Sequence, residues 1–203
     1  YDWWKAGKYQ PYSDKVLQNL IAACKKIVPP YVRIIRLIRD IPGESIMAGN
    51  LITNLRQVMK DRGVACRCIR CREAGERVEV KSKKLEIIKY QASGGMEYFL
   101  SYESKDGKIL YGFCRLRLGN TTPLAPLVRG VAIIRELHVY GELVSVGGNK
   151  KVQHAGLGKM LMKQAEKIAK NSGFKTMAVI SGVGVRGYYK KLGFRLKSSY
   201  MVK

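Results

Sequence analysis

The motif VQHAGLGKM, residues 152–160, carries the strongest fold signal in this chain. The run VAIIRELHVYG at residues 131–141 precedes it and predicts a strand, while LGKMLMKQAEKIAK after it has the spacing of an amphipathic helix ending near Ser172. Gly156 and Gly158 remove Cβ atoms where a backbone must approach an anion, and the amides and dipole of a helix start favour phosphate. We therefore expect a phosphate-binding loop between a strand and a helix.

Two better-known phosphate-binding patterns do not fit this stretch. The pattern G-x-x-x-x-G-K-[ST] fails because Met160 follows Gly158 and Lys159, so ATP or GTP hydrolysis is unsupported. The pattern G-x-G-x-x-G with a downstream acidic residue also fails, so dinucleotide binding is unsupported. A plain glycine-rich turn before a helix stays open as the alternative, because G-x-G alone is a weak signal.

Periodicity elsewhere in the chain predicts an α+β architecture for its second half. In the first half, residues 14–28 have helical spacing with Ser13 as N-cap and Pro29 as a stop, and the β-branched run at 31–42 predicts a buried strand. The other predicted elements are a helix at 54–63, strands at 77–90, 97–104 and 109–118 with a hairpin at 105–107, a strand at 175–181, a helix at 185–193 and a closing strand at 194–202.

The net charge of the 203-residue chain is +23, from 38 Lys and Arg against 15 Asp and Glu. A charge of this sign and size favours a polyanionic partner. Nucleic acid is preferred to a membrane surface, because the sequence shows no basic amphipathic helix with an aromatic apolar face. No apolar run approaches the ~20 residues of a membrane span. A thermophile's surface is the alternative, although lysine enrichment there usually brings glutamate with it.

Three of the five cysteines, Cys66, Cys68 and Cys71, fall within six residues. An odd cysteine count without a secretory signal argues against disulfides and favours a reducing, cytoplasmic compartment. Three thiolates at this spacing can converge on one metal ion, for which zinc in a structural role is the default. The fourth ligand stays open between Cys24, Cys114, a histidine, water and a residue outside the chain. A reactive redox pair is the alternative.

The loop at residues 153–160 resembles motif A of the GNAT acetyltransferase superfamily. The resemblance implies that acetyl-CoA binds there, with its pyrophosphate on the loop amides and its pantetheine arm along the preceding strand. The implied cofactor-binding residues are Glu136, Leu137, His138, Val139, Gln153, His154, Ala155, Gly156, Leu157, Gly158, Lys159, Met160 and Tyr189. Residues 189–194 resemble the family's closing Y-x-x-x-G-F, which implies that Tyr189 protonates the leaving thiolate. Tyr188 is the alternate donor, and core packing is the plain alternative.

Longer stretches resemble the family of the catalytic subunit of Elongator, a tRNA-modifying complex. They are PPYVRIIRLIRDIP, TNLRQ and CRCIRCRE in the first half, and GGMEYFLSYE, IRELHVYG, VISGVGVRGYYKKLGF and SYMVK in the second. The resemblance spans essentially the whole chain. It implies an acyltransferase that places a carboxymethyl-type modification on the wobble uridine of tRNA, with acetyl-CoA as donor. It also implies a radical S-adenosylmethionine domain in front of this region.

The iron–sulfur cluster of such a domain uses a C-x₃-C-x₂-C spacing, which this chain lacks. We therefore expect S-adenosylmethionine and the cluster to belong to a part outside this chain, which begins at Tyr1 and which we expect to be a piece of a longer protein. The expected divisions are a radical-domain remnant at 1–50, a linker with the metal-binding cysteines at 51–85 and an acetyltransferase domain at 86–203. The expected partners are tRNA and other subunits or a second copy, with no membrane.

The acceptor of the acetyl group stays open between tRNA and a protein lysine of the histone type. A lysine acceptor needs a carboxylate base, and Glu136 is the candidate, although Arg135 or His138 could equally hold it in an ion pair. The basic composition favours RNA over a basic protein tail. The expected tRNA-binding residues, each with a solvated surface as its alternative, are Arg33, Arg36, Arg39, Arg67, Arg70, Arg72, Lys81, Lys83 and Lys84. An RNA-binding module with a vestigial acetyl-CoA fold is the third hypothesis.

Overall fold

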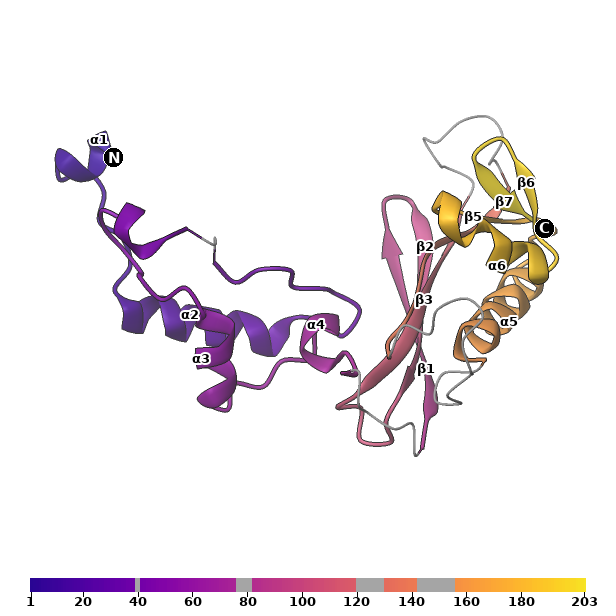
Figure 1. Cartoon of the computed structure of the whole chain (residues 1–203), viewed down its shortest axis with the longest axis horizontal. Coiled ribbons are helices and arrows are strands. Elements are labelled where there is room, and N and C mark those ends of the chain that lie inside the picture. The colour runs from indigo at the N-terminus through magenta and orange to yellow at the C-terminus, as the bar shows by residue number, and fades with distance from the viewer. Residues whose placement is uncertain (39–40, 76–81, 120–129, 142–155) are drawn as a thin grey trace. The chain divides into compact units, whose positions relative to one another are not determined.

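The chain folds into two compact units, Tyr1–Arg72 and Glu73–Lys203. The computed structural model describes residues 1–38, 41–75, 82–119, 130–141 and 156–203 (Figure 1). The first unit is helical, and the second contains the whole of the described sheet. None of the described helices is long and apolar enough to span a membrane.

The first unit is built from short helices. They are α1 (Asp2–Lys5), α2 (Asp14–Ile27), the 3₁₀ turn η1 (Gly43–Ser45), α3 (Leu55–Asp61) and α4 (Ile69–Arg72). The predicted start of α2 is confirmed, because the Ser13 side chain accepts a hydrogen bond from the Val16 N–H. The helix predicted at 54–63 is confirmed by α3. Gly63, just behind it, adopts φ +68°, the left-handed conformation that often follows a helix.

The strand predicted at residues 31–42 is wrong. The described residues of this stretch form no strand, and Ile35 is 74% exposed. A β-branched run needs neighbouring strands to pair its backbone and bury its side chains, and the described part of the first unit has none. The stretch is held by Arg56, whose guanidinium donates to the carbonyls of Ile34 (2.8 Å) and Ile35 (3.2 Å).

A seven-stranded sheet in the order β1-β2-β3-β4-β5-β7-β6 forms the frame of the second unit. Neighbouring strands are antiparallel except β4 and β5, which are parallel. The strands are β1 (Lys84–Ala92), β2 (Gly95–Glu103), β3 (Leu110–Leu118), β4 (Ala132–Val139), β5 (Met177–Val179), β6 (Arg195–Lys197) and β7 (Tyr200–Val202). The helical elements are α5 (Leu157–Asn171), η4 (Val183–Val185) and α6 (Arg186–Lys191). The predicted α+β class is confirmed.

The hairpin between β2 and β3 is built as its sequence predicts. Gly107 adopts φ +71°, and the Asp106 carboxylate accepts hydrogen bonds from the Ser104 hydroxyl (2.6 Å) and the Lys108 N–H (3.1 Å). These contacts close the turn from within, so the two long strands that it joins enter the sheet in a defined register.

Two predicted strands differ from the observed ones. The strand predicted at 77–90 starts at Lys84 as β1, and residues 76–81 lie outside the described part of the chain. The single closing strand predicted at 194–202 is wrong, because β6 and β7 form a hairpin that turns at Ser198 with φ +53°. A serine in the left-handed region is an uncommon turn signal, which explains the error.

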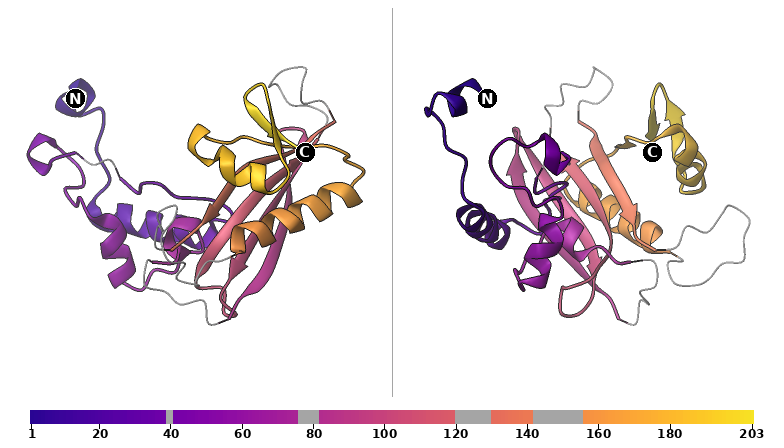
Figure 2. Two further views of the ribbon diagram at one scale, coloured as in Figure 1. Left: turned by 45° about the vertical axis from the view of Figure 1, so that its right-hand side comes forward. Right: turned by 60° about the vertical axis from the view of Figure 1, so that its left-hand side comes forward.

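The apolar face of α5 packs on β2, β3 and β4, as Figure 2 shows. Its buried residues are Leu157, Leu161, Met162, Ala165 and Ala169. Burying one leucine side chain stabilises a fold by about 1.5–3 kcal/mol, so this face fixes the helix firmly on the sheet. Its first turn thereby lies beside the carboxyl end of β4, where an ideal Cβ on Gly158 would be 3.7 Å from Val139 Cγ2.

Candidate functional site

The two parallel strands of the sheet separate after a short paired stretch. β4 and β5 pair only at Ala132–Ile134 with Met177–Val179, and the Ile180 N–H donates to the Ile134 carbonyl (3.1 Å). From Arg135 to Val139, β4 has no partner on this edge among the described residues, although β3 pairs with its other edge. An unpaired strand edge presents N–H and C=O groups that can bind an extended, amide-containing ligand.

The amino-terminal end of α5 lies beside this open edge. Gly156 is its N-cap, with φ +103° and ψ −11°, a backbone conformation that glycine adopts without the strain of a Cβ. No side chain caps the helix, and its first turn holds no acidic residue, so its first amides can bind an anion. The predicted loop residues Gln153, His154 and Ala155 lie outside the described residues.

Two buried polar atoms beyond the carboxyl end of β5 have no hydrogen-bond partner among the described residues. They are Ser181 Oγ and Arg186 Nε, in the segment that leads from β5 through η4 into α6. Buried polar atoms are nearly always paired, so two orphaned donors close together in sequence indicate a place where a ligand belongs. A polar ligand between β4 and β5 fits this observation.

The two tyrosines proposed as proton donors lie next to each other on α6. Tyr188 is 38% exposed, and an ideal Cβ on Gly158 would be only 2.7 Å from its hydroxyl oxygen. The Tyr188 hydroxyl therefore reaches the first turn of α5. Tyr189 is buried and packs edge-on against Phe194, with ring centroids 6.0 Å apart. The helix thus brings one exposed and one buried phenol to the same end of the sheet.

Both phenols are protonated at neutral pH. Burial, followed by the proximity of Tyr188 and Cys114, raises the pKa of Tyr189 to about 12. Burial and Cys114 also raise the pKa of Tyr188. A protonated phenol in a buried setting can donate a hydrogen bond to a thiolate that develops nearby, which is the property needed of a leaving-group acid.

The Glu136 carboxylate is held in an ion pair by a residue that the sequence does not single out. Its Oε2 accepts from Arg115 Nε at 2.9 Å, and its side chain is 42% exposed. The Arg115 guanidinium also lies over the rings of Phe99 (5.3 Å) and Phe113 (5.5 Å), which fixes it on the sheet. The only sequence feature that indicates Arg115 as a partner of Glu136 is the alternation of Arg115 and Arg117 in β3.

The two neighbours expected to pair with Glu136 have other contacts. Arg135 donates to the buried Glu97 carboxylate at 2.7 Å, and His138 packs against Tyr140 with ring centroids 4.4 Å apart. A register shift between β3 and β4 follows Arg115, and Arg135 is the residue of β4 that it leaves without a partner on β3. The ion-pair alternative for Glu136 is therefore correct, with Arg115 as the partner.

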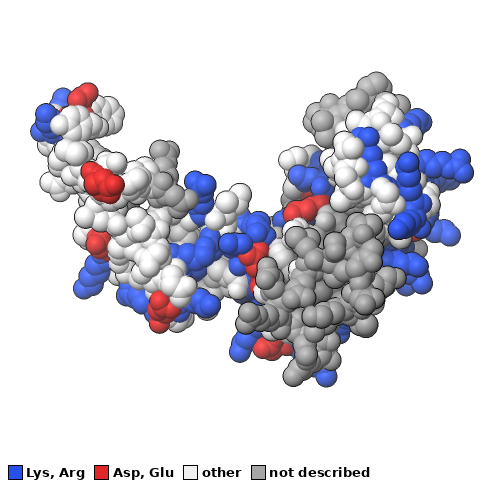
Figure 3. Space-filling view, viewed as in Figure 1, with Lys and Arg blue, Asp and Glu red and all other residues white. Residues whose placement is uncertain are grey.

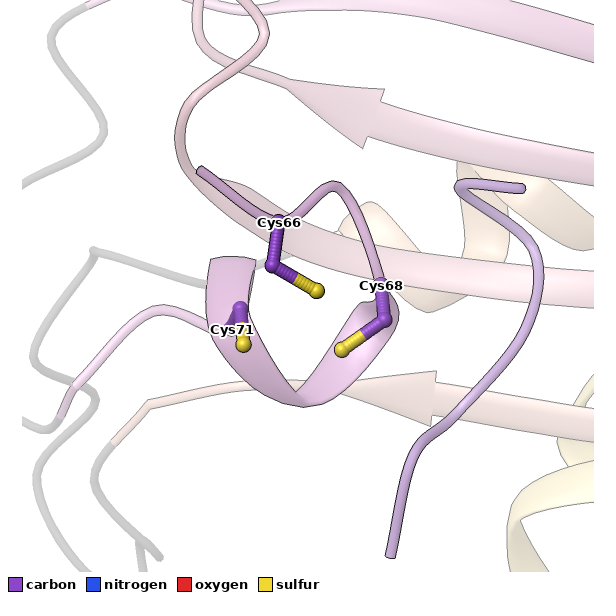
Figure 4. A group of neighbouring side chains, drawn as sticks. All are labelled: Cys66, Cys68 and Cys71. Carbon is purple, nitrogen blue, oxygen red and sulfur yellow. The ribbon is translucent and has the colours of Figure 1, made fainter. Parts of the chain in front are cut away.

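The three clustered cysteines converge in the first unit, as Figure 4 shows. The sulfur atoms of Cys66, Cys68 and Cys71 all lie within 4.8 Å of one another. Burial raises the pKa of the Cys66 thiol to about 11. Burial also raises the pKa of Cys68, but the backbone N–H groups of Ile34 and Cys71 outweigh it, so the net pKa lies below the usual value. The convergence of the three sulfur atoms fits a single metal ion, which binds cysteine as thiolate.

Two cations from distant parts of the first unit reach the same sulfur. Lys25 Nζ lies 3.7 Å and an Arg56 guanidinium nitrogen 3.6 Å from Cys71 Sγ. Lys25 is only 3% exposed, although its position near the end of α2 predicts a solvated lysine. Cys24 is exposed and, among the described residues, no other cysteine, histidine or carboxylate joins the three thiols.

The residues predicted to bind tRNA have mixed surroundings. Arg36, Arg67, Arg70 and Lys83 are exposed, and Arg33 and Lys84 are half-buried, with Lys84 Nζ 2.8 Å from a Glu86 carboxylate oxygen. Arg72 is buried and donates to the carbonyls of Arg67 (2.7 Å) and Pro30 (2.9 Å). Its guanidinium therefore stabilises the fold and is not available to bind a phosphate. Arg39 and Lys81 lie outside the described residues.

Two protein families match different parts of the chain. Residues 69–194 match the acetyltransferase (GNAT) family, and residues 1–62 match the radical SAM C-terminal domain. The first match covers the open strand pair, α5 and the two tyrosines described above. The GNAT-type fold predicted from the sequence is confirmed.

Curated relatives and a solved structure resemble the whole chain. Elongator complex protein 3 from Homo sapiens is 44% identical over 100% of the chain and 40% of its own length. The tRNA uridine(34) acetyltransferase of Dehalococcoides mccartyi is 44% identical over 99% of the chain and 46% of its own length. The archaeal Methanocaldococcus infernus Elp3 with an N-terminal deletion superposes with a TM-score of 0.84 at 38% identity, covering 100% of this chain and 51% of that one. The chain thus spans less than half the length of these curated relatives.

Proposed function

Because the chain belongs to the acetyltransferase (GNAT) family, we propose that its second unit binds acetyl-CoA as the acyl donor of an enzyme that modifies the wobble uridine of tRNA. The modification is of the carboxymethyl type. Support comes from the similarity of the whole chain to a tRNA uridine(34) acetyltransferase and to Elongator complex protein 3.

The observation that carries the acetyl-CoA site is the early separation of β4 from β5 beside an uncapped helix start. The unpaired edge of Glu136–Val139 suits the amides of a pantetheine arm, and the free amides of α5 suit the pyrophosphate. Gly156 and Gly158 keep that approach free of side chains. The orphaned Ser181 Oγ lies beyond β5, where it can pair with the same ligand.

In this site a phenol of α6 protonates the departing CoA thiolate. Tyr189 is the proposed donor because its buried, protonated phenol faces no bulk water. Tyr188 is the alternate, and its hydroxyl lies closer to the first turn of α5. Paired Phe variants separate the two, since only loss of the donor slows cleavage without weakening CoA binding.

The site favours an RNA acceptor over a protein lysine. A lysine acceptor needs a free carboxylate to take its proton, but the Glu136 carboxylate accepts from Arg115 at 2.9 Å. Protonating Glu136 would break this ion pair. The residue is therefore better suited to linking β3 and β4 through Arg115 than to acting as a base. The charge of +23 points the same way, since a basic protein tail would be repelled.

Zinc is the ion that the Cys66, Cys68 and Cys71 thiolates would hold. Their mutual distances fit one tetrahedral ion, which supplies a structural cross-link without redox chemistry. Three thiolates around a divalent ion carry a net negative charge, and Lys25 and Arg56 beside Cys71 offset it. Water is the proposed fourth ligand, since no further cysteine, histidine or carboxylate of the described residues joins the cluster.

The remaining chemistry belongs to the part of the relatives that this chain does not match. We place S-adenosylmethionine and an iron–sulfur cluster there, because residues 1–62 match a radical SAM C-terminal domain and the cysteine spacing of the cluster does not occur in this chain. The similarity to Elongator complex protein 3 supports assembly with further subunits.

Release of free CoA from acetyl-CoA, measured with and without tRNA, tests the proposal. The expected result is slow release by the chain alone and faster release when tRNA is added. An acetyl-accepting lysine peptide serves as the competing acceptor. Transfer to the peptide at a rate indifferent to tRNA would contradict an RNA acceptor, and the absence of acetyl-CoA binding would contradict the site itself.

A further inference from the structure

The carboxyl-terminal stretch of the second unit is the most one-sidedly charged part of the chain. Residues 157–203, all of them described, contain 11 Lys and Arg and a single acidic residue, Glu166. None of these cations belongs to the clusters proposed above for tRNA. Figure 3 shows Lys and Arg side chains gathered on the surface over α5 and the elements that follow it.

Four lysines of α5 form a continuous stripe. Lys159, Lys163, Lys167 and Lys170 are all exposed, and at 100° per residue they fall within about 80° of arc. The buried Leu161 and its apolar neighbours occupy the opposite face of the helix. The α5 lysine stripe, defined by these four residues, extends for about 16 Å at 1.5 Å per residue.

The fold does not neutralise this stripe. Exposed helix faces usually place Glu four residues from Lys, whereas here Lys159, Lys163 and Lys167 repeat at that spacing and repel one another. Lys170 alone has an acidic residue, Glu166, four positions before it. Glu166 is already occupied, because both its carboxylate oxygens accept from Lys203 Nζ at 3.0 and 3.1 Å. Lys159 also lies in the first turn, where its charge opposes the helix dipole. An arrangement that costs helix stability in isolation is stabilised by a polyanion.

A cavity at the far end of the stripe continues the same character. It has a volume of about 510 Å³ and is lined by Lys170, Lys175 and Lys203, by Glu166, and by the turn that links α5 to β5. Lys203 is fixed there by its bonds to Glu166 and by its position over the Phe194 ring. The stripe and the cavity together offer a row of cations that starts at the predicted pyrophosphate site and runs the length of α5.

We propose that the α5 lysine stripe and the cavity at its end bind the phosphate backbone of the RNA substrate. This inference rests on the proposed function and adds to it a surface on the acetyltransferase unit that orients tRNA. A regular row of cations without hydrophobic anchors matches a phosphate backbone, which is read by charge alone. An acidic protein segment would need apolar contacts as well, and the exposed large apolar side chains of α5 are limited to Met160.

The test is a triple variant of the stripe, Lys163→Gln, Lys167→Gln and Lys170→Gln, which leaves Lys159 at the proposed CoA site intact. Binding of unmodified tRNA is measured by fluorescence anisotropy across a series of salt concentrations. At about 0.1 M salt we expect at least about ten-fold weaker binding, and a slope of log Kd against log salt reduced by about 2–3. Affinity for CoA should not change, which confirms that the unit is folded.

A matched control removes the same charge from lysines of the unit that lie outside α5. Lys89→Gln, Lys105→Gln and Lys108→Gln change three exposed lysines of β1 and the β2–β3 hairpin, and we expect less than about two-fold weaker tRNA binding. Equal losses in the two triple variants would overturn the stripe as a specific RNA surface and leave the proposed function standing. Failure of the unchanged chain to bind tRNA at any salt would overturn both.

Discussion

Replacing Gly156 by aspartate should abolish acetyl-CoA binding, and replacing it by asparagine should not. Gly156 caps α5 with φ +103°, and an ideal Cβ there would meet no atom within 4 Å. Either side chain therefore has room, and both types tolerate a left-handed backbone better than most. The two variants share shape and backbone strain and differ only in one negative charge.

The structure sets the size of each effect. Placing a non-glycine residue in the left-handed region costs about 1–2 kcal/mol in both variants. A carboxylate about 5 Å from a phosphate, at an effective dielectric constant of about 20, adds roughly 3 kcal/mol of repulsion for each phosphate charge. The Asp variant should therefore bind CoA at least about 100-fold more weakly than the Asn variant.

Isothermal titration of both variants with CoA measures this difference, and thermal unfolding shows whether the fold is intact. The Asn variant should bind within about ten-fold of the unchanged chain. Equal affinities for Asp and Asn would mean that no anion lies at the amino-terminal end of α5.

Four further predictions concern three single side chains. Tyr189→Phe should slow acetyl-CoA cleavage about 100-fold with CoA affinity nearly unchanged, and collapse of affinity would make Tyr189 a packing residue. Because the pKa of Tyr189 is about 12, its acid form persists below that pH, so the unchanged chain should lose no cleavage rate through this group up to about pH 11. Cys68→Ser should remove the bound zinc measured by mass spectrometry, and retained metal would contradict the cluster. Arg117→Ala should lower the free energy of unfolding in urea by about 3 kcal/mol, because the buried Glu97 loses one of two partners; a change under 0.5 kcal/mol would contradict this.

Local signals predicted most of the second unit. The glycines and the 3.6-residue period of 156–171 predicted α5 to within one residue of its observed end. Lys105-Asp106-Gly107 predicted the hairpin between β2 and β3. The sequence signal for each of these elements lies within its own segment, in the period of an apolar helix face or in the residues of a closed turn. The strand predicted at 31–42 failed for the opposite reason, since its β-branched residues require partner strands that the described part of the first unit does not contain.

The contacts that tune the two sites could not be read from sequence. Arg115 meets Glu136 only because of the register of β3 against β4 and the shift that follows Arg115. Lys25 and Arg56 reach Cys71 from 46 and 15 residues away. Neither cation stands out in composition or period, because charge compensation between distant segments depends on tertiary packing.

The central claim is that acetyl-CoA lies in the opening between β4 and β5, and a structure with a non-hydrolysable acetyl-CoA analogue tests it most directly. The pyrophosphate should lie on the amides of the first turn of α5, the pantetheine arm along Glu136–Val139, and the sulfur within hydrogen-bond reach of a phenol of α6. An analogue bound elsewhere, or a pyrophosphate that makes no contact with the start of α5, would contradict it.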